Sequence, residues 1–219
     1  MLMVITKHKT SAPTREDGRE TRAAIIEWAG TLFAKKGYAN TTSKEICQAA
    51  GVNLAAVNYH FGSRDGLYIA VLEEVHDYLL NIDILTELSS RPWPPDKKLK
   101  VFLDFYIEAA FEKNDWHVRV WIRELLNPSP FIGDILSRKG LPKFFIIQDL
   151  FREALGFDGA DIRSYSAFLS LTAPFILTFI AQDSPVLSCL PVRYPREQFI
   201  SALKDNFLRT VEALNQNHQ

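Results

Sequence analysis

The sequence contains 219 residues, of which 47% are hydrophobic, and has a formal net charge of −1 at pH 7. This length allows one large helical domain, or a small domain followed by a second core. The longest apolar run, residues 168–181, is interrupted by polar residues and is too short to span a bilayer. The only two cysteines, Cys47 and Cys189, have no disulfide or metal-binding spacing, which predicts reduced thiols in a cytoplasmic protein.

The charge is distributed unevenly along the chain. Residues 1–66 hold nine Lys and Arg against six Asp and Glu, whereas residues 67–219 hold sixteen against twenty. A basic face on an acidic protein can still bind a polyanion, because only the charges near the phosphates release counterions. The N-terminal part is therefore the place to look for a nucleic-acid contact.

Residues 1–15 are predicted to form a disordered arm, which is followed by a helix. The arm has too short an apolar run for a signal peptide, and its basic residues are either a solvated tail or a contact to a minor groove. Apolar residues then recur at helical spacing from about Glu16 to Lys36, and Gly37 is expected to end this helix.

Residues 42–61 contain two short helical patterns joined by a glycine turn. Thr42 and Glu45 have the spacing of a capping box, which places the start of the first helix at Thr42. Gly51 allows the chain to leave that helix, and Asn53 is a good N-cap for the second one. This order predicts a helix-turn-helix, in which the second helix enters the major groove of DNA.

Position in the motif gives each side chain an expected role. Asn58 is predicted to face outward, where its amide can pair with adenine, and Leu54 and Ala55 are predicted to contact thymine methyl groups. Leu54 also precedes Val57 by three residues, so it can equally be a partly buried core residue. The other candidates for DNA contacts are polar or aromatic residues around the motif: Thr42, Ser43, Lys44, Asn53, Tyr59, His60 and Arg64.

Several of these candidates have simpler alternatives. His60 can be a packing or capping residue, and Tyr59 can be an ordinary surface aromatic. Arg64, next to Asp65, can be a solvated surface charge. The order of the residues carries more weight than any one of them.

Residues 29–67 resemble the DNA-binding domain of the TetR-type transcriptional regulators. The matching residues include Ala50-Gly51-Val52 and Tyr59-His60-Phe61. The resemblance implies an all-α fold, with a three-helix domain at residues 16–62 and a larger helical ligand-binding and dimerisation domain at residues 63–219. The second helix departs from the usual family residues at Leu54, Ala55 and Asn58, so an operator sequence cannot be transferred from a relative.

The same resemblance implies a function. It is that of a homodimeric repressor that binds a palindromic operator in double-stranded DNA and is released by a small-molecule effector, without a cofactor. Such release requires that the effector bind the two states of the dimer with different affinity.

After residue 63 the apolar pattern predicts helices and no strand. Ser63 is expected to cap a helix whose apolar residues recur every four positions and which extends to about Leu85. Further helices are expected over residues 99–109, 118–125 and 144–155, near Phe131, after about Asp158 and after Pro195.

The helices in the middle of the chain are rich in aromatic residues. Such residues line ligand pockets between helices, although at helical spacing they more often form the core. The candidate pocket for a small, largely apolar ligand comprises Phe102, Phe105, Tyr106, Trp121, Glu124, Phe144 and Phe175. Glu124 has an alternative role in pairing with a helix end, and Pro174 is expected to kink its helix.

The last two predicted helices carry more apolar residues than one core face needs. A two-fold dimer that joins both helices of each subunit in a four-helix bundle would bury them, and it suits a palindromic operator. The candidate interface residues are Phe168, Ile176, Phe179, Ile200, Leu203, Phe207 and Val211. The alternative is that both stripes belong to the internal core of one subunit.

The sequence has features of two other classes of function. Glu73 and His76 have the Glu-x-x-His spacing of carboxylate-bridged metal bundles, but the sequence holds no second copy, and no catalytic or metal-binding residue is predicted. A DNA-binding protein without a small-molecule effector is the closer alternative, and a filled core in the larger domain would favour it.

Overall fold

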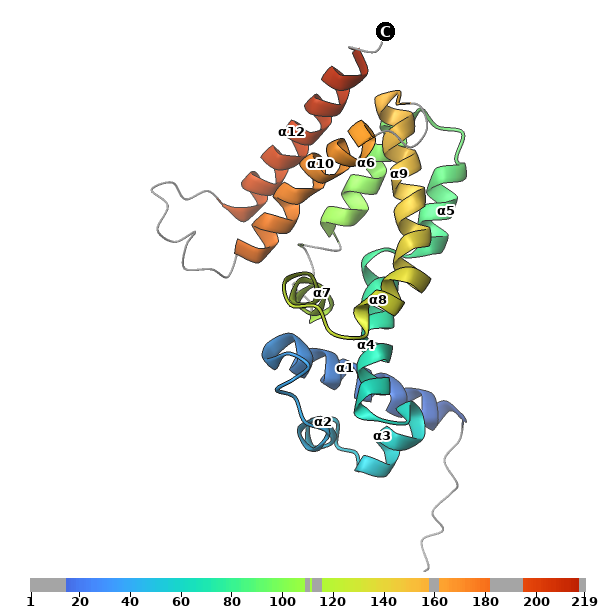
Figure 1. The fold of residues 1–219 in the computed structure, drawn as a ribbon, viewed down its shortest axis with the longest axis vertical. Coiled ribbons are helices and arrows are strands. Elements are labelled where there is room, and N and C mark those ends of the chain that lie inside the picture. The colour runs from blue at the N-terminus through green and yellow to red at the C-terminus, as the bar shows by residue number, and fades with distance from the viewer. Residues whose placement is uncertain (1–14, 109–110, 112–115, 158–161, 182–194, 217–219) are drawn as a thin grey trace, which may run out of the picture. The chain divides into compact units, whose positions relative to one another are not determined.

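The computed structural model describes residues 15–108, 111, 116–157, 162–181 and 195–216 (Figure 1). Helices are the only regular structure in these ranges, which confirms the all-helical expectation. The chain forms two compact units, residues 1–71 and residues 72–219. The division falls inside helix α4 (Arg64–Leu79), whereas the sequence placed the boundary between residues 62 and 63.

The first unit consists of four helical segments. They are α1 (Arg15–Lys36), α2 (Ser43–Ala50), α3 (Leu54–Phe61) and the first half of α4. Each helix contributes a fully buried apolar residue, namely Ile25, Ile46, Val57 and Leu67 in chain order. The ring of Tyr68, on α4, lies edge-on to Phe33 at 4.7 Å between centroids, so the start of α4 belongs to this core.

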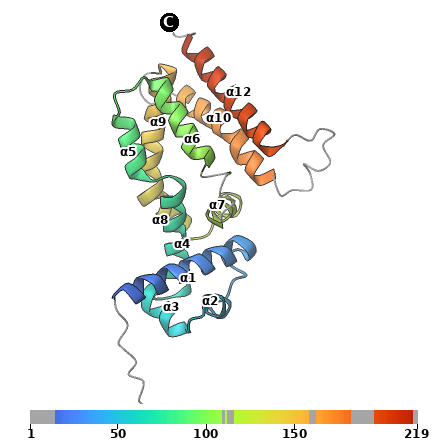
Figure 2. The ribbon, with the colours of Figure 1, turned by 180° about the vertical axis from the view of Figure 1, so that it is seen from behind.

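The second unit consists of the end of α4 and the helices that follow (Figure 2). They are α5 (Ile82–Ser90), α6 (Pro95–Ile107), α7 (Trp116–Leu126), α8 (Ile132–Ile135), the π-helix η2 (Leu136–Gly140), α9 (Leu141–Leu155), α10 (Ile162–Ala181) and α12 (Arg196–Gln216). Helix α9 contacts α5, α6, α10 and α12. None of the helices in the described ranges is long and apolar enough to cross a membrane.

Helix α4 is shorter than the sequence indicated. It ends at Leu79, and the Asn81 side chain caps α5 by accepting hydrogen bonds from the amides of Asp83 at 2.8 Å and Ile84 at 3.3 Å. An asparagine at an N-cap stabilises a new helix start at the expense of continuing the old one. The expectation of one helix as far as Leu85 was therefore wrong.

The core of the second unit is built from aromatic side chains around Phe151. The Phe151 ring is completely buried and lies edge-on to the rings of Phe168 at 5.3 Å, Phe207 at 5.9 Å and Phe102 at 6.4 Å. These rings come from α9, α10, α12 and α6, so one side chain joins four helices that are far apart in the sequence. Burying such a side chain stabilises the fold by about 1.5–3 kcal/mol.

Candidate nucleic-acid interface

Helices α2 and α3 begin and end where their capping residues dictate. The Thr42 amide donates to the Glu45 carboxylate at 2.9 Å, and the Glu45 amide donates to the Thr42 hydroxyl at 3.3 Å, which completes the predicted capping box. Gly51 leaves α2 at a φ of 66°, in the left-handed region that favours glycine. The Asn53 side chain accepts from the Ala56 amide at 2.9 Å and fixes the first turn of α3.

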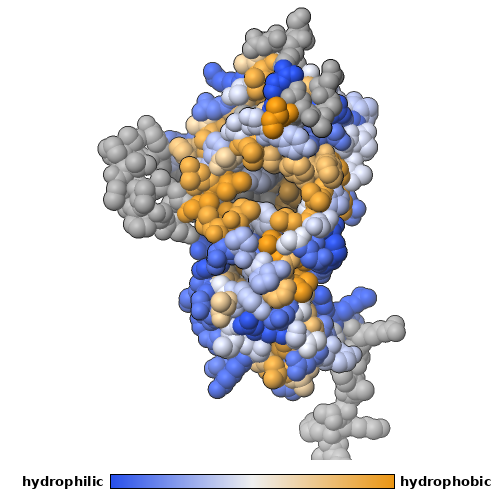
Figure 3. All heavy atoms as spheres, viewed as in Figure 1, coloured by the Kyte–Doolittle hydropathy of each residue, from blue (hydrophilic) through white to orange (hydrophobic). Residues whose placement is uncertain are grey.

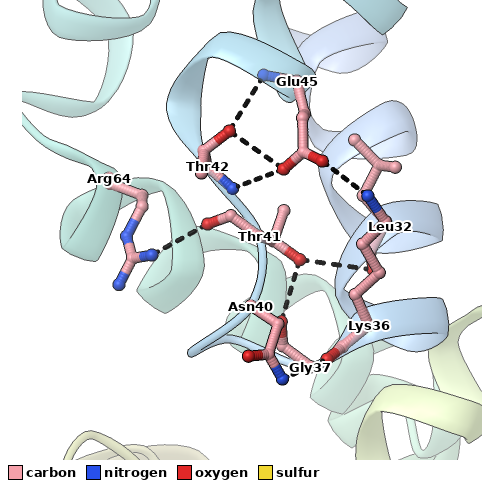
Figure 4. Close-up of polar contacts among 8 residues, drawn as sticks. All are labelled: Leu32, Lys36, Gly37, Asn40, Thr41, Thr42, Glu45 and Arg64. Carbon is pink, nitrogen blue, oxygen red and sulfur yellow. Dashed lines mark hydrogen bonds and ion pairs between the residues drawn. The ribbon is translucent and has the colours of Figure 1, made fainter.

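The Glu45 carboxylate also ties α2 to the end of α1 (Figure 4). Lys36 Nζ lies 2.5 Å from its Oε1, while the other carboxylate oxygen accepts from the Thr42 amide and hydroxyl. The hydrogen bond from Lys36, followed by those from Thr42, lowers the pKa of the Glu45 carboxyl to about 2. Glu45 therefore stays ionised and holds the entry of α2 in place.

Arg64 fastens the start of α4 to the α1–α2 loop. Its guanidinium donates to the backbone carbonyls of Thr41 at 2.8 Å and Tyr38 at 3.3 Å, and lies 4.2 Å from the centroid of the Tyr38 ring. The Thr41 hydroxyl in turn donates to the Gly37 carbonyl at 2.8 Å (Figure 4). Arg64 is thus engaged inside the first unit, which neither of its sequence-based roles anticipated.

The predicted base-reading residues, Leu54, Ala55 and Asn58, share one exposed face of α3 with Tyr59, which was predicted as a phosphate contact. Leu54 is 52% exposed, Tyr59 is 84% exposed, and Ala55 and Asn58 are exposed as well. They are spaced one and four residues apart, which places them on neighbouring lines of the helix surface. Val57 points the other way and is fully buried. The alternative core role of Leu54 is therefore at most partial.

The remaining candidates lie at the edges of the motif and differ in exposure and in whether their side chains already form hydrogen bonds. Lys44 is exposed, and no hydrogen bond of its side chain is recorded in the described residues, whereas Thr42 and Asn53 use their side-chain oxygens as caps. Ser43 is half-buried. His60 is half-buried too, and its ring lies edge-on to Tyr59 at 5.0 Å.

One basic residue near the motif, Arg22, was not predicted from the sequence as part of this site. Arg22, an exposed residue of α1, has its guanidinium 5.3 Å from the centroid of the Phe61 ring at the end of α3. The two residues are distant in sequence, so no local spacing could reveal this contact. It places a cation next to the C-terminus of α3, where a positive charge is favourable.

The second unit contains a cavity of about 250 Å³ between the end of α4, α5 and α6. Its lining is mostly apolar and comprises Tyr78, Leu79, Leu80, Asn81, Ile84, Leu85, Leu88, Phe102, Phe105 and Glu108. Of the predicted pocket residues, Phe102 and Phe105 line it. The leucines and isoleucine of α5 were not predicted as lining residues, because aliphatic residues at helical spacing do not distinguish a cavity from a filled core.

The other predicted pocket residues take part in packing elsewhere in the second unit. Trp121 lies edge-on to the His76 ring at 4.9 Å, and Phe144 stacks on Tyr165 at 6.0 Å. Two further members, Tyr106 and Phe175, lie edge-on to each other at 6.4 Å. Glu124 is buried and accepts from the amide of Ser129 at 3.0 Å and its hydroxyl at 2.9 Å, close to its alternative role at a helix end.

The candidate dimer residues on α10 and α12 divide between the core and the surface. Phe207 and Val211 are each only 3% exposed and belong to the core of the second unit, so they have almost no area to offer a partner. The partly buried members that pack against this core are Phe168, Ile200 and Leu203. Ile176 is partly buried, and the side chain of Phe179 lies outside the described residues.

Other apolar residues of α10 and α12 face outward. Leu169 is 62% exposed and Leu177 is 65% exposed, and Ile162 and Phe199 are exposed as well. Residues 162, 169 and 177 recur at intervals of seven and eight, which places them on one side of α10. Figure 3 shows hydrophobic residues gathered on the visible face of this unit.

A polar cluster surrounds the second half of α4. The buried Lys143 ammonium donates to the His76 carbonyl at 2.5 Å and lies 3.5 Å from Asp77, and Arg138 pairs with Glu73 at 3.1 Å. Burial of the imidazole, with a smaller contribution from the charge of Lys143, lowers the pKa of His76 to about 4. Arg138 thus engages the Glu73 carboxylate, whereas Lys143 contacts the backbone of His76, and the described residues hold no group of three potential metal ligands.

Two capped helices at a glycine turn, with an exposed face on the second helix, define a helix-turn-helix protein of the DNA-binding class. Residues 25–71 match the family model described as bacterial regulatory proteins, tetR family. The matched segment is thus a helix-turn-helix DNA-binding domain of the TetR type.

Two curated relatives have sequences similar to this chain. The biofilm operon icaADBC HTH-type negative transcriptional regulator IcaR of Staphylococcus aureus is 29% identical over 114 residues, which cover 52% of this chain and 59% of the relative. The HTH-type transcriptional regulator TtgR of Pseudomonas putida is 42% identical over 64 residues, 29% of this chain and 30% of the relative. The chain thus spans little more than half the length of the first relative. Both names are those of regulators, not enzymes.

The fold is similar to that of solved family members. The crystal structure of the TetR family transcriptional regulator PfmR from Thermus thermophilus has a TM-score of 0.62 and 20% sequence identity, and covers 84% of this chain and 97% of that one. At this identity the likeness establishes the helical fold, including the larger helical domain that follows the helix-turn-helix along the chain.

Proposed function

We propose that this protein is a dimeric transcriptional regulator that binds a palindromic operator through α3 and represses the adjacent genes. The observation that carries the proposal is the exposed face of α3, where Leu54, Ala55, Asn58 and Tyr59 stand free on a helix whose start is fixed by the Asn53 cap. A rigid helix with outward side chains suits the major groove. The printed name of IcaR, a negative transcriptional regulator, supports the direction of control.

Contacts to the DNA backbone follow from the position of the free donors. Lys44, exposed on α2, suits a phosphate contact, because the first helix of such a motif crosses the backbone. Ser43, at the start of α2, and Tyr59, on α3, offer hydroxyl groups. These contacts position the protein without specifying the sequence.

Dimerisation is proposed through the exposed apolar side of α10 and through Phe199 of α12, which is exposed as well. Leu169 and Leu177 expose large apolar side chains, which remain in contact with water unless a partner covers them. A two-fold partner that buries them would present two copies of α3 to half-sites about 34 Å apart, one turn of the double helix.

The cavity lined by α4, α5 and α6 is the proposed effector site. Its lining combines apolar residues with the polar groups of Asn81, Tyr78 and Glu108, which suits a small, largely apolar ligand with one or two polar atoms. Its volume of about 250 Å³ limits the ligand to a small molecule. Binding would release DNA only as far as the ligand prefers the state of the dimer that does not bind the operator.

Selection of bound fragments from random DNA tests the proposal. The purified full chain should enrich a two-fold symmetric sequence, and compounds that release the winning fragment in a gel-shift assay should bind in the cavity. Substitution of Leu88, a cavity residue on α5, by Phe should then weaken release while leaving operator binding intact. Enrichment of no sequence above the starting pool would contradict the proposed function.

A further inference from the structure

We infer that each α3 helix reads A·T base pairs, with Leu54 and Ala55 against thymine C5-methyl groups and Asn58 on a neighbouring adenine. This inference rests on the proposed function and deepens it, because it names the chemical class of half-site that this chain can recognise. It depends on what α3 exposes and on what the residues around α3 have already engaged.

The exposed face of α3 offers no cation for guanine. Guanine is most often read by an arginine or lysine that donates to O6 and N7, and residues 54–61 contain neither. The nearest arginine along the chain, Arg64, donates to the backbone carbonyls of Thr41 and Tyr38 and is held over the Tyr38 ring. Lys44 lies on α2, in the position of a phosphate contact.

The apolar residue at the first position of α3, Leu54, is only partly buried. Leu54 is 52% exposed although the Asn53 cap fixes its backbone, so its side chain is held at the end of the helix that meets base edges. Ala55 is exposed next to it, and its small side chain permits a close approach to the groove. In the major groove, the C5-methyl group of thymine is the apolar feature that such side chains can contact.

Asn58 lies four residues after Leu54, on the same side of the helix. It is exposed, and no hydrogen bond of its side chain is recorded in the described residues. A free amide presents one donor and one acceptor, the pair that matches N7 and N6 of adenine. Since adenine pairs with thymine, the contacts expected of Leu54 and of Asn58 both favour A·T base pairs.

Removal of the methyl groups alone provides the test. The operator is taken from the selection described above, and each half-site thymine is replaced in turn by deoxyuridine, which lacks the C5-methyl group and keeps the same hydrogen-bonding groups. At one or two thymines per half-site, affinity for the full-length protein should fall by about fourfold, the effect of one apolar carbon removed from contact. Deoxyuridine in the spacer between half-sites is the matched control and should have no effect.

The variant Leu54→Ala assigns the effect to one side chain. It shortens an exposed residue and leaves the Asn53 cap in place, so the fold should persist. Leu54→Ala should bind the thymine operator about as weakly as the unchanged protein binds the deoxyuridine operator, and it should lose sensitivity to that thymine methyl group. Retained sensitivity would overturn the assignment to Leu54.

The outcomes separate this inference from the proposed function. A selected operator whose half-sites consist of G·C pairs, or one whose affinity changes with none of the deoxyuridine replacements, would overturn the inference while leaving specific DNA binding in place. A selection that enriches no sequence would overturn both.

Discussion

The two units of this chain are each stabilised by a different kind of contact. In the first unit, polar contacts at helix ends fix the positions of short helices: the Thr42–Glu45 capping box, the Lys36–Glu45 ion pair and the Arg64 contacts to Thr41 and Tyr38. In the second unit, aromatic rings around Phe151 join long helices, and a cavity remains beside them. The first unit therefore fixes its short helices mainly at their ends, whereas the second unit is organised around a large aromatic core.

The largest expected effect comes from the core of the second unit. Phe151→Ala removes a completely buried ring and should destabilise the protein by about 3–5 kcal/mol, because a cavity replaces contacts with three other rings. Denaturant unfolding measures this loss. Phe145→Ala, an exposed position on the same helix, is the matched control and should change stability by less than about 1 kcal/mol. Equal effects at both positions would deny Phe151 its central role.

The second effect is a dependence of stability on pH. The pKa of His76 is lowered to about 4 in the folded state from 6.5, so between these values the unfolded chain binds the extra proton. Stability from this group is therefore present above pH 6.5 and declines as the pH falls, by about 2 kcal/mol at pH 5. His76→Phe, which keeps a ring beside Trp121, should flatten the change in unfolding free energy between pH 7 and pH 5. An unchanged slope in the variant would assign the dependence to other groups.

A smaller effect is expected at the cap of α2. Thr42→Ala removes the hydroxyl that accepts from the Glu45 amide and should cost about 1 kcal/mol of stability. Thr42→Ser retains a hydroxyl that can cap, and it should restore most of the loss in thermal unfolding. If serine and alanine behaved alike, the hydroxyl would not be the stabilising group.

The smallest effect concerns the phosphate contact of Lys44. Lys44→Ala should weaken binding to all DNA sequences modestly and reduce the slope of log affinity against log salt by about 0.9, the value for one phosphate. Titrations over a range of salt concentrations measure this slope. An unchanged slope would remove Lys44 from the interface, and the exposed Lys97, in the second unit, serves as the control position.

The features predicted correctly from the sequence are those encoded over a few residues. Thr42 and Glu45, Gly51 and Asn53 act through spacing of three residues or fewer, so the capping box, the turn and the start of α3 were confirmed. The same local logic failed beyond α4, because the periodic apolar residues up to Leu85 said nothing about the Asn81 cap between two helices.

Features that depend on distant residues were not accessible. The contact of Arg64 with Tyr38 joins residues 26 positions apart, and only the fold brings them together. On α10 and α12, apolar residues surround much of each helix, so periodicity could not tell the buried Phe207 from the exposed Leu177. In the middle helices, aromatic residues at helical spacing mostly fill the core, and Leu88 and Ile84 supply more of the cavity than the sequence suggested.

The central claim is that α3 reads bases through its exposed face, and Asn58→Ala tests it most directly. A gel-shift titration would compare this variant with the unchanged protein on the selected operator and on a nonspecific duplex of the same length. Loss of the Asn58 amide should weaken operator binding by about 1–3 kcal/mol, roughly five- to 160-fold, and leave nonspecific binding unchanged. Equal losses on both duplexes, or no loss on the operator, would contradict base reading by α3.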